Sequence, residues 1–233
     1  KVDAIVFCWQ PGQEGGHTVA SILCGEVNPS GHLPSTMTTE YELEPSAKNF
    51  PQVYADKPFN YSFYRQLDGR VRNLIKNIDY TLYEEGMYVG YRYFETIPGA
   101  YEKVNYPFGY GLSYADFSYG KAKLSSKSIK AGENVTVTLE LKNNNGVASD
   151  EVVQIYVKRL GDADAPLKAL KGFRRVSMSG GEKKSVSIEL PASSFEYYDS
   201  AADDLVVKPG KYQILYGSSS ADADLKALSL IIK

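Results

Sequence analysis

Four stretches in the second half of the chain alternate apolar and polar residues with a period of two. They are Val135–Leu141, Val153–Val157, Val186–Leu190 and Tyr212–Tyr216, and the apolar stretch Leu225–Ile232 follows them. Successive side chains of a β-strand point to opposite faces, so each alternating stretch predicts a strand with one buried face. Turn-forming residues at 143–146, 180–181 and 209–210 separate the stretches. The region has about 115 residues and no helical period, which predicts an antiparallel sandwich of about seven strands.

The beginning of the chain has a different pattern. Val2–Trp9 is an almost continuous apolar run, which predicts a strand buried on both faces, as in a parallel sheet. A turn rich in glycine follows at 11–16, and a helix is expected from about His17. The residues expected to form the buried stripe of this helix are Val19, Ile22 and Leu23. Gly25 suits a left-handed C-terminal cap. Because one strand–loop–helix unit cannot bury its own core, the rest of an α/β sheet is expected upstream or in another chain.

The middle of the chain is marked by tyrosine. The sequence has 19 tyrosines, and 14 of them lie between Tyr41 and Tyr119. Prolines interrupt this region, so we expect a connector that wraps over neighbouring domains and buries its rings. A short strand is expected at Met87–Phe94. The predicted division is therefore an α/β piece at 1–36, a connector at 37–115 and a β-sandwich at 116–233.

Charge, hydropathy and cysteine usage exclude several classes of protein. The net charge of −2 argues against a nucleic-acid partner, and no apolar run approaches the roughly 20 residues that span a bilayer. No signal peptide is visible. With two histidines, a histidine-based zinc site is not expected, and no cofactor is predicted. Cys8 and Cys24 allow one disulfide, but two buried thiols, one on a strand and one on a helix, are the favoured interpretation.

The glycine-rich turn is the candidate site. It follows a predicted strand, and α/β domains place their ligands at the carboxyl ends of strands. Gln13 and Glu14 are therefore candidate substrate-binding residues at the rim of a site. The turn is a poor match to a phosphate loop, which needs Gly-Lys-Ser/Thr or Gly-x-Gly-x-x-Gly. The simpler interpretation is a tight turn in which Glu14 caps the helix.

The chain contains three pairs of adjacent acidic residues, and Glu84-Glu85 is the pair that lies among the aromatic residues of the connector. Carboxylates that cleave glycosidic bonds face each other about 5 to 9.5 Å apart, whereas neighbours in sequence point apart. Glu84-Glu85 is therefore expected to be solvated or to pair with Arg92. Asp150-Glu151 and Asp203-Asp204 lie at predicted strand edges and are also expected to be solvated.

Two further surface features allow more than one interpretation. Tyr197-Tyr198 could stack on sugar rings, but an edge of the sandwich packed against another domain is favoured. Asn134–Thr136 is a glycosylation sequon at the start of a predicted strand. Such triplets are common by chance, so it assigns no cellular compartment.

Three groups of motifs, taken in order, resemble the C-terminal part of glycoside hydrolase family 3. The first group is Trp9–Gly16 (WQPGQEGG), Gly25–Gly31 (GEVNPSG) and Leu33-Pro34; the second is Tyr83–Phe94 and Tyr106–Tyr114; the third is Glu151–Val157, Leu170–Phe173, Lys208–Tyr212 and Tyr216–Ser219. The set covers nearly the whole chain and looks most like bacterial β-glucosidases of the family. His32 departs from the pattern, since a lysine is common there.

The resemblance implies the end of an α/β sandwich domain, a connector and a fibronectin type III-like sandwich. It also implies an exo-acting, retaining β-glycosidase, in which an aspartate nucleophile and a glutamate acid/base both lie upstream of this chain. No catalytic residue is therefore assigned here, and we expect the chain alone to be inactive.

The implied partners are the N-terminal catalytic half, as another chain or a missing segment, and a β-linked oligosaccharide. The expected reaction is release of terminal glucose, with a β-xylosidase or another exo-β-glycosidase as the alternative. A non-catalytic carbohydrate-binding module is the alternative of a different class. Secretion or export to the periplasm is implied by the family alone.

Overall fold

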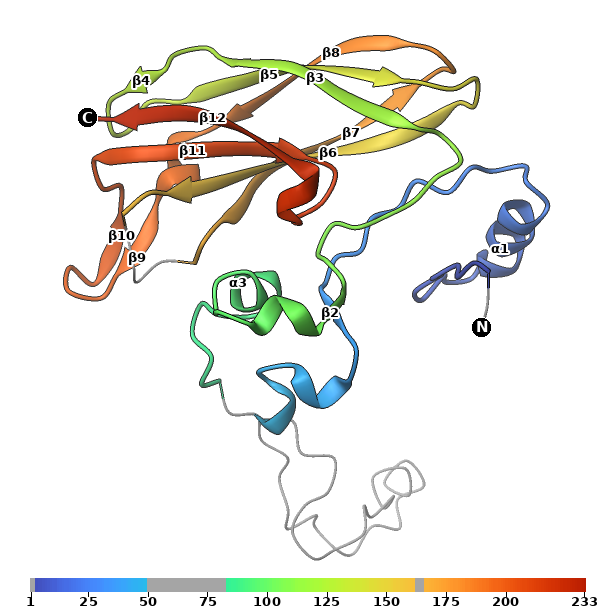
Figure 1. The fold of residues 1–233 in the computed structure, drawn as a ribbon, viewed down its shortest axis with the longest axis horizontal. Helices are drawn as coiled ribbons and strands as arrows, with labels where there is room; N and C mark the ends of the chain where they lie inside the picture. Colours follow the sequence, from blue (N-terminus) through green and yellow to red (C-terminus); the bar gives the residue numbers. More distant parts are fainter. Residues whose placement is uncertain (1–2, 50–82, 162–165) are drawn as a thin grey trace, which may run out of the picture. The chain divides into compact units, whose positions relative to one another are not determined.

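The computed structural model describes residues 3–49, 83–161 and 166–233 (Figure 1). The chain divides into two compact units, of which one contains residues 1–34 with 107–233 and the other contains residues 35–106. The predicted domains at 1–36, 37–115 and 116–233 are a different division and stay a prediction.

The sandwich consists of two sheets. Its strands are β3 (Phe117–Leu124), β4 (Ser128–Ile129), β5 (Val135–Asn143), β6 (Ser149–Arg159), β7 (Ala169–Met178), β8 (Lys183–Leu190), β11 (Gly210–Gly217) and β12 (Leu225–Ile232). One sheet has the order β4-β12-β11-β6-β7 and the other has the order β3-β5-β8. All pairings are antiparallel except the short parallel pairing of β4 with β12. The predicted sandwich is confirmed, and β4 adds a short strand that the pattern did not indicate.

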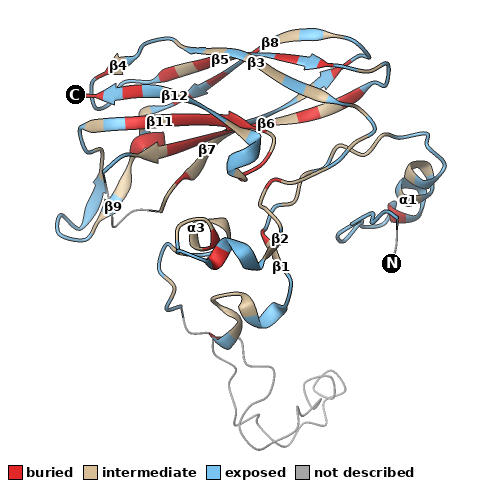
Figure 2. Ribbon diagram, viewed as in Figure 1, coloured by how far each residue is buried: buried red, intermediate tan, exposed pale blue. Residues whose placement is uncertain are grey.

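The alternating residues form the core between the sheets (Figure 2). Val135, Val137, Leu139 and Leu141 of β5 are each at most 1% exposed. The predicted inward faces of β6, β8 and β11 are also buried, as the period of two requires. Full burial of one such side chain contributes about 1.5–3 kcal/mol to the free energy of unfolding.

Short elements complete the connections of the sandwich. They are η5 (Ala192–Phe195), η6 (Asp222–Asp224) and a ribbon of β9 (Tyr197–Asp199) with β10 (Asp204–Val206). In β9 and β10, Tyr198 lies opposite Leu205, and both side chains are more than half exposed.

The predicted strand at Val2–Trp9 is not formed. Residues 3–9 are exposed and belong to no helix or strand, and Val2 lies outside the described residues. A strand needs a neighbour to accept its backbone hydrogen bonds, and no described strand lies beside this segment. The expectation was wrong because it assumed a sheet that the described residues do not contain.

The predicted helix is confirmed as α1 (Gly15–Leu23), two residues earlier than expected. Gly25 has φ +76°, and the N–H of Glu26 donates to the Ser21 carbonyl while that of Gly25 donates to Ile22. This paired pattern is the Schellman motif, so the predicted left-handed cap is confirmed. The predicted buried stripe is only partly buried, with Leu23 71% exposed.

The second unit contains short elements. They are β1 (Met37–Thr38), η1 (Tyr41–Leu43), η2 (Ala47–Asn49), α3 (Tyr91–Phe94), η4 (Ala100–Lys103) and β2 (Val104–Tyr106), with β1 antiparallel to β2. The strand expected at Met87–Phe94 is wrong, because the N–H groups of Tyr93 and Phe94 both donate to Gly90 and begin a helical turn. Phe94 is fully buried against the edge of Tyr93. Four of the connector tyrosines, at 54, 61, 64 and 80, lie outside the described residues.

Candidate functional site

The candidate rim residues lie at the beginning of α1. Gln13 and Glu14 are both exposed, and Glu14 is the N-cap residue of the helix. The prediction that Glu14 caps the helix is confirmed for its position, but its side chain makes no capping hydrogen bond. Its backbone carbonyl instead accepts the N–H and the hydroxyl of Thr18, at 3.1 and 3.2 Å. The Glu14 carboxylate is therefore exposed and makes no capping contact, although it lies near the positive end of the helix dipole.

An exposed apolar surface precedes the rim. Ile5, Phe7 and Trp9 are 71%, 53% and 62% exposed, and the rings of Phe7 and Trp9 meet edge to face at 5.2 Å. Trp9 has φ +51°, a conformation that a bulky residue rarely adopts without support from its surroundings. The apolar pattern of the sequence predicts these residues only as part of a buried strand. Their exposure identifies a surface that lacks its covering layer in the described residues.

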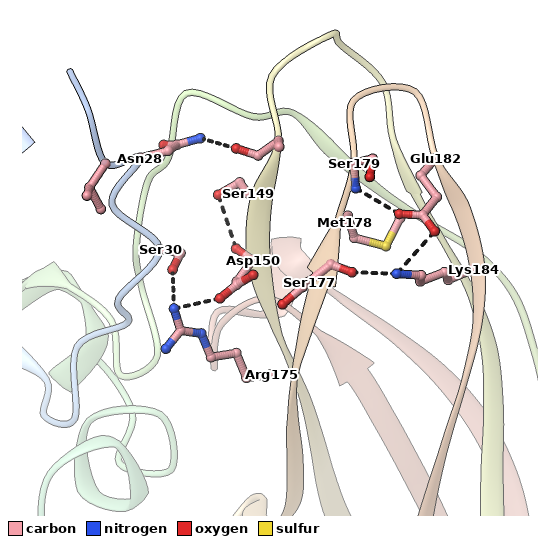
Figure 3. A pocket seen from close by; sticks show the side chains of 12 residues that line it. Asn28, Ser30, Ser149, Asp150, Arg175, Ser177, Met178, Ser179, Glu182 and Lys184 are labelled. Carbon is pink, nitrogen blue, oxygen red and sulfur yellow. Dashed lines mark hydrogen bonds and ion pairs between the residues drawn. The ribbon is translucent and has the colours of Figure 1, made fainter.

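The segment after α1 is attached firmly to the sandwich. We call Asn28–Leu33 the docking segment. The Asn28 amide donates to the Ala148 carbonyl at 3.0 Å and accepts the N–H of Tyr114 at 2.9 Å. Figure 3 shows Arg175 between Ser30 and Asp150, at 3.2 and 2.6 Å. These contacts line a cavity of about 460 Å³.

The docking segment also pairs with the loop that leads into β3. Leu33 donates to the Tyr110 carbonyl and accepts the Gly109 N–H, both at 2.8 Å. A Cβ at Gly111 would lie 2.3 Å from the Gly31 carbonyl oxygen, so this close approach requires glycine. Two motifs that are distant in sequence thus form one contact.

Gln154 is the buried centre of that contact. It is 3% exposed, and its amide donates to the carbonyls of Gly109 and Ser218 while its oxygen accepts the Tyr156 hydroxyl. The Nδ1 atom of His32 lies 2.5 Å from the same Gly109 oxygen. Since a carbonyl only accepts, Nδ1 carries the proton. Gln154 and Tyr156 therefore bury polar groups on the face of β6 that points away from the core.

The pair Asp150-Glu151 does not have the predicted solvation. Asp150 is ion-paired with Arg175, and Glu151 is only 6% exposed. Its carboxylate accepts the Tyr119 hydroxyl at 2.5 Å. Burial raises the pKa of Glu151, while the Tyr119 hydrogen bond and nearby His32 oppose this increase. Burial and Glu151 also raise the pKa of Tyr119. The prediction was wrong because the docking segment and β3 cover the beginning of β6.

Comparisons with known proteins agree with this arrangement. Residues 1–91 match the family model "Glycosyl hydrolase family 3 C-terminal domain", and residues 151–220 match "Fibronectin type III-like domain". The chain belongs to glycoside hydrolase family 3 and matches the C-terminal part of its members.

Several relatives in the family match almost the whole chain. A xylan 1,4-beta-xylosidase of Xylanibacter ruminicola is 34% identical over 99% of this chain and 22% of its own length. Thermostable beta-glucosidase B of Acetivibrio thermocellus is 35% identical over 97% of this chain and 26% of its own length. The structure of beta-glucosidase 3B from Thermotoga neapolitana in complex with glucose is 33% identical, with a TM-score of 0.78, and covers 99% of this chain and 28% of its own. The chain thus spans about a quarter of the length of these relatives.

The acidic pairs outside the docking contact have separate partners in this family 3 chain. Glu84 is 3.4 Å from Lys48, and Glu85 accepts the Asn49 amide at 2.5 Å. Neither forms an ion pair with Arg92, so that alternative is wrong for the described residues. Asp203-Asp204 is exposed, as predicted.

Both cysteines are free and exposed, so the expected buried thiols are wrong. Cys8 lies in the segment where no strand forms, and Cys24 is the C-cap of α1. Within the described ranges, no group of three or more His, Cys, Asp or Glu side chains is placed to hold a metal ion. The described helices are all too short or too polar to cross a bilayer.

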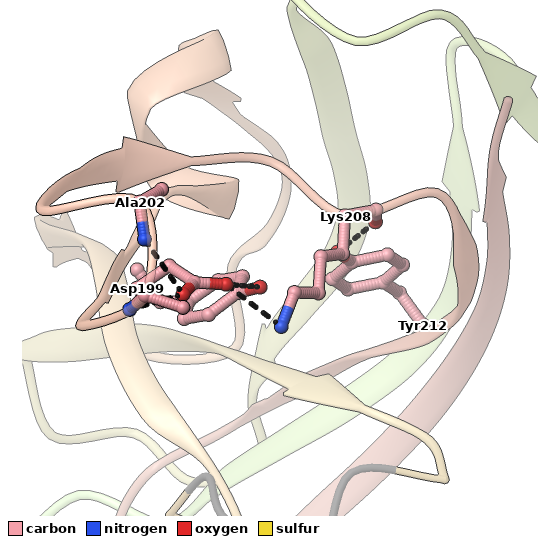
Figure 4. Close-up of polar contacts among 6 residues, drawn as sticks. Asp199, Ala202, Lys208 and Tyr212 are labelled. Atoms are coloured by element: carbon pink, nitrogen blue, oxygen red, sulfur yellow. Dashed lines mark hydrogen bonds and ion pairs between the residues drawn. The ribbon is translucent and has the colours of Figure 1, made fainter.

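The tyrosine pair of β9 contains two different environments. Arg159 and Lys208 lie 4.2 and 4.8 Å from the centre of the Tyr197 ring. Figure 4 shows the ion pair between the Lys208 ammonium group and Asp199, at 3.0 Å. The backbone carbonyl of Lys208 accepts the Tyr212 hydroxyl at 2.6 Å. Tyr198 is 52% exposed, which leaves it as the ring of the pair available for stacking.

Proposed function

We propose that this chain is the C-terminal portion of an exo-acting, retaining β-glycosidase and that it supports the catalytic site. The supporting observation is the exposed apolar surface of Ile5, Phe7 and Trp9, which precedes the rim residues Gln13 and Glu14 in the chain. Such a surface is expected where the remainder of an α/β sheet packs. The relatives, which are about four times longer, have room for that sheet and for a further domain.

The proposed mechanism assigns the bond-breaking groups to the upstream part. Retention needs two carboxyl groups about 5 to 5.5 Å apart, one as nucleophile and the other as acid and then base. An aspartate nucleophile and a glutamate acid/base upstream would supply them. Gln13 and Glu14 would hydrogen-bond substrate hydroxyls at the rim, where orientation rather than covalent chemistry is required.

The proposed partner is the N-terminal catalytic half, as a second chain or a segment of the same protein. The sandwich would hold the catalytic domains in register through the docking segment, and the connector would form a contact surface. The proposed role in the cell is degradation of β-linked oligosaccharides and polysaccharides after secretion or export to the periplasm.

The proposal is tested by supplying the upstream half of the protein. Hydrolysis of an aryl β-glucoside is expected only when both halves are present. Full activity of the upstream half alone would contradict a supporting role for this chain, and activity of residues 1–233 alone would contradict the assignment of the catalytic carboxylates.

The rim residues are tested in the combined protein. Glu14→Gln is expected to raise KM with a smaller change in kcat, as for a binding contact. Glu26→Gln, a matched change in an exposed residue after α1, is the control. A loss in kcat alone would show that Glu14 acts in the chemical step.

A β-xylosidase is the second substrate candidate, because a xylan 1,4-beta-xylosidase is among the relatives that match 99% of the chain. Relative kcat/KM for aryl β-glucoside and aryl β-xyloside decides between them. The non-catalytic alternative rests on the exposed Tyr198 ring. Retention of residues 1–233 on insoluble glucan, lost in Tyr198→Ala, would favour a binding module.

A further inference from the structure

A second cavity, of about 350 Å³, lies where the docking segment meets the sandwich. Its walls come from the docking segment, the beginning of β3, the beginning of β6 and the connection from β11 to β12. The ionisable and aromatic residues that line it are His32, Asp116, Phe117, Tyr119, Asp150, Glu151, Asp224 and Lys226. The cavity is therefore assembled from four separate parts of the chain.

Glu151 directs a buried acceptor toward this cavity. It is 94% buried, and one carboxylate oxygen, Oε1, accepts the Tyr119 hydroxyl. Among the described residues, no group donates a hydrogen bond to its second oxygen, Oε2. This oxygen is not among the fully buried atoms that lack a partner, so it can accept a hydrogen bond from a donor that enters the cavity.

Neighbouring groups add acceptors and one donor. His32 uses Nδ1–H for the Gly109 carbonyl, and its second ring nitrogen, Nε2, has no protein partner among the described residues. Asp224 accepts the Ser219 hydroxyl through Oδ2 and has Oδ1 remaining. Lys226 donates to the Tyr119 carbonyl and retains two further N–H groups. Phe117 and Leu225 supply an apolar wall.

We propose that this cavity binds a polyhydroxylated ring of monosaccharide size. Adjacent hydroxyls of such a ring would donate to Glu151 and Asp224, and a ring oxygen would accept from Lys226. The apolar wall suits the carbon face of the ring. The volume exceeds one ordered water by about tenfold, at roughly 30 Å³ for each water, so a small organic ligand fits.

The test uses the full chain, labelled with ¹⁵N, and D-glucose as the probe. Glucose is titrated from the millimolar range to about 100 mM. The amide chemical shifts of His32, Tyr119 and Lys226 are expected to change and to reach saturation. Glu151→Gln retains an acceptor for Tyr119 but replaces the second oxygen with an amide donor. It should weaken binding about tenfold, as expected for loss of a charge-assisted hydrogen bond.

Glu189→Gln, an exposed carboxylate on β8, is the matched control and should leave the affinity unchanged. If Glu151→Gln does not fold, Asp224→Asn is measured instead, with the same expected direction. The absence of saturable shifts, shifts that map away from the cavity, or equal affinity in the variants would overturn the proposal. Binding of methylammonium but not glucose would overturn the ligand class, and binding of neither would leave the cavity to water alone.

Discussion

The sandwich strands and the N-terminal segment both carry apolar patterns that predict strands, but only the sandwich residues form them. The inward residues of β5 are buried because β3 and β8 pair with its two edges and the second sheet covers its face. The apolar residues 3–9 remain exposed and form no strand. The comparison teaches that an apolar pattern predicts a strand only where the chain also supplies its neighbours.

The largest expected effect is in the sandwich core. Leu139 is 1% exposed, and Leu139→Ala should lower the free energy of unfolding by about 2–5 kcal/mol, through lost burial and a residual cavity. Urea denaturation measures it, with Glu140→Ala on the exposed side of β5 as the control. Equal effects of the two substitutions would contradict the assignment of the core.

The next effect concerns the buried contact that joins the docking segment to the sandwich. Gln154→Leu should lower the free energy of unfolding by about 2–4 kcal/mol, since it removes the amide donor to the Gly109 and Ser218 carbonyls and the acceptor of the Tyr156 hydroxyl. Gln213→Leu on β11, a partly exposed glutamine of the same sheet, is the control for the change in residue type. A loss no larger than that of the control would show that the network contributes little.

A smaller effect depends on pH. Because burial raises the pKa of Glu151 above 4.5, the folded protein binds this proton more tightly than the unfolded chain. The resulting stabilisation is complete below pH 4.5 and is lost as pH rises through the folded pKa. The stability of the native chain relative to Glu151→Gln should therefore fall with rising pH in this window. Denaturation of both proteins across a pH series measures it, and a difference independent of pH would contradict it.

The smallest effect is expected at α1. Leu23 is 71% exposed, so Leu23→Ala in the chain alone should change the free energy of unfolding by less than about 0.5 kcal/mol. Once the catalytic half is supplied, the same substitution should destabilise the combined protein measurably if α1 packs on its sheet. A large effect in the chain alone would mean that α1 is already covered.

Several parts of the fold could be predicted because the responsible interactions are local or periodic. The cap at Gly25 depends on one residue with positive φ, and the inward faces of β5, β8 and β11 follow from the period of two. The helical turn of α3 could not be predicted in this way. Its aromatic residues also favour strands, and the burial of Phe94 against Tyr93 decides the outcome.

The candidate site, like the fold, was predicted from the sequence only in part. Gln13 and Glu14 lie where the turn before α1 was expected, and their role stays a prediction. The cavity around Glu151 was missed, although its sequence neighbour Gln154 offered one signal. A glutamine within the apolar run of β6 occupies a position where a polar group needs buried partners.

The sequence by itself determined which residues of each strand share a face, since alternation is a property of the extended backbone. It also determined the order of the family's motifs along the chain. Only the tertiary structure decided that Glu151 and Gln154 are buried on β6 while Ile5 and Trp9 are exposed. Burial depends on what covers a residue, and the covering groups come from distant segments or from parts beyond the described chain.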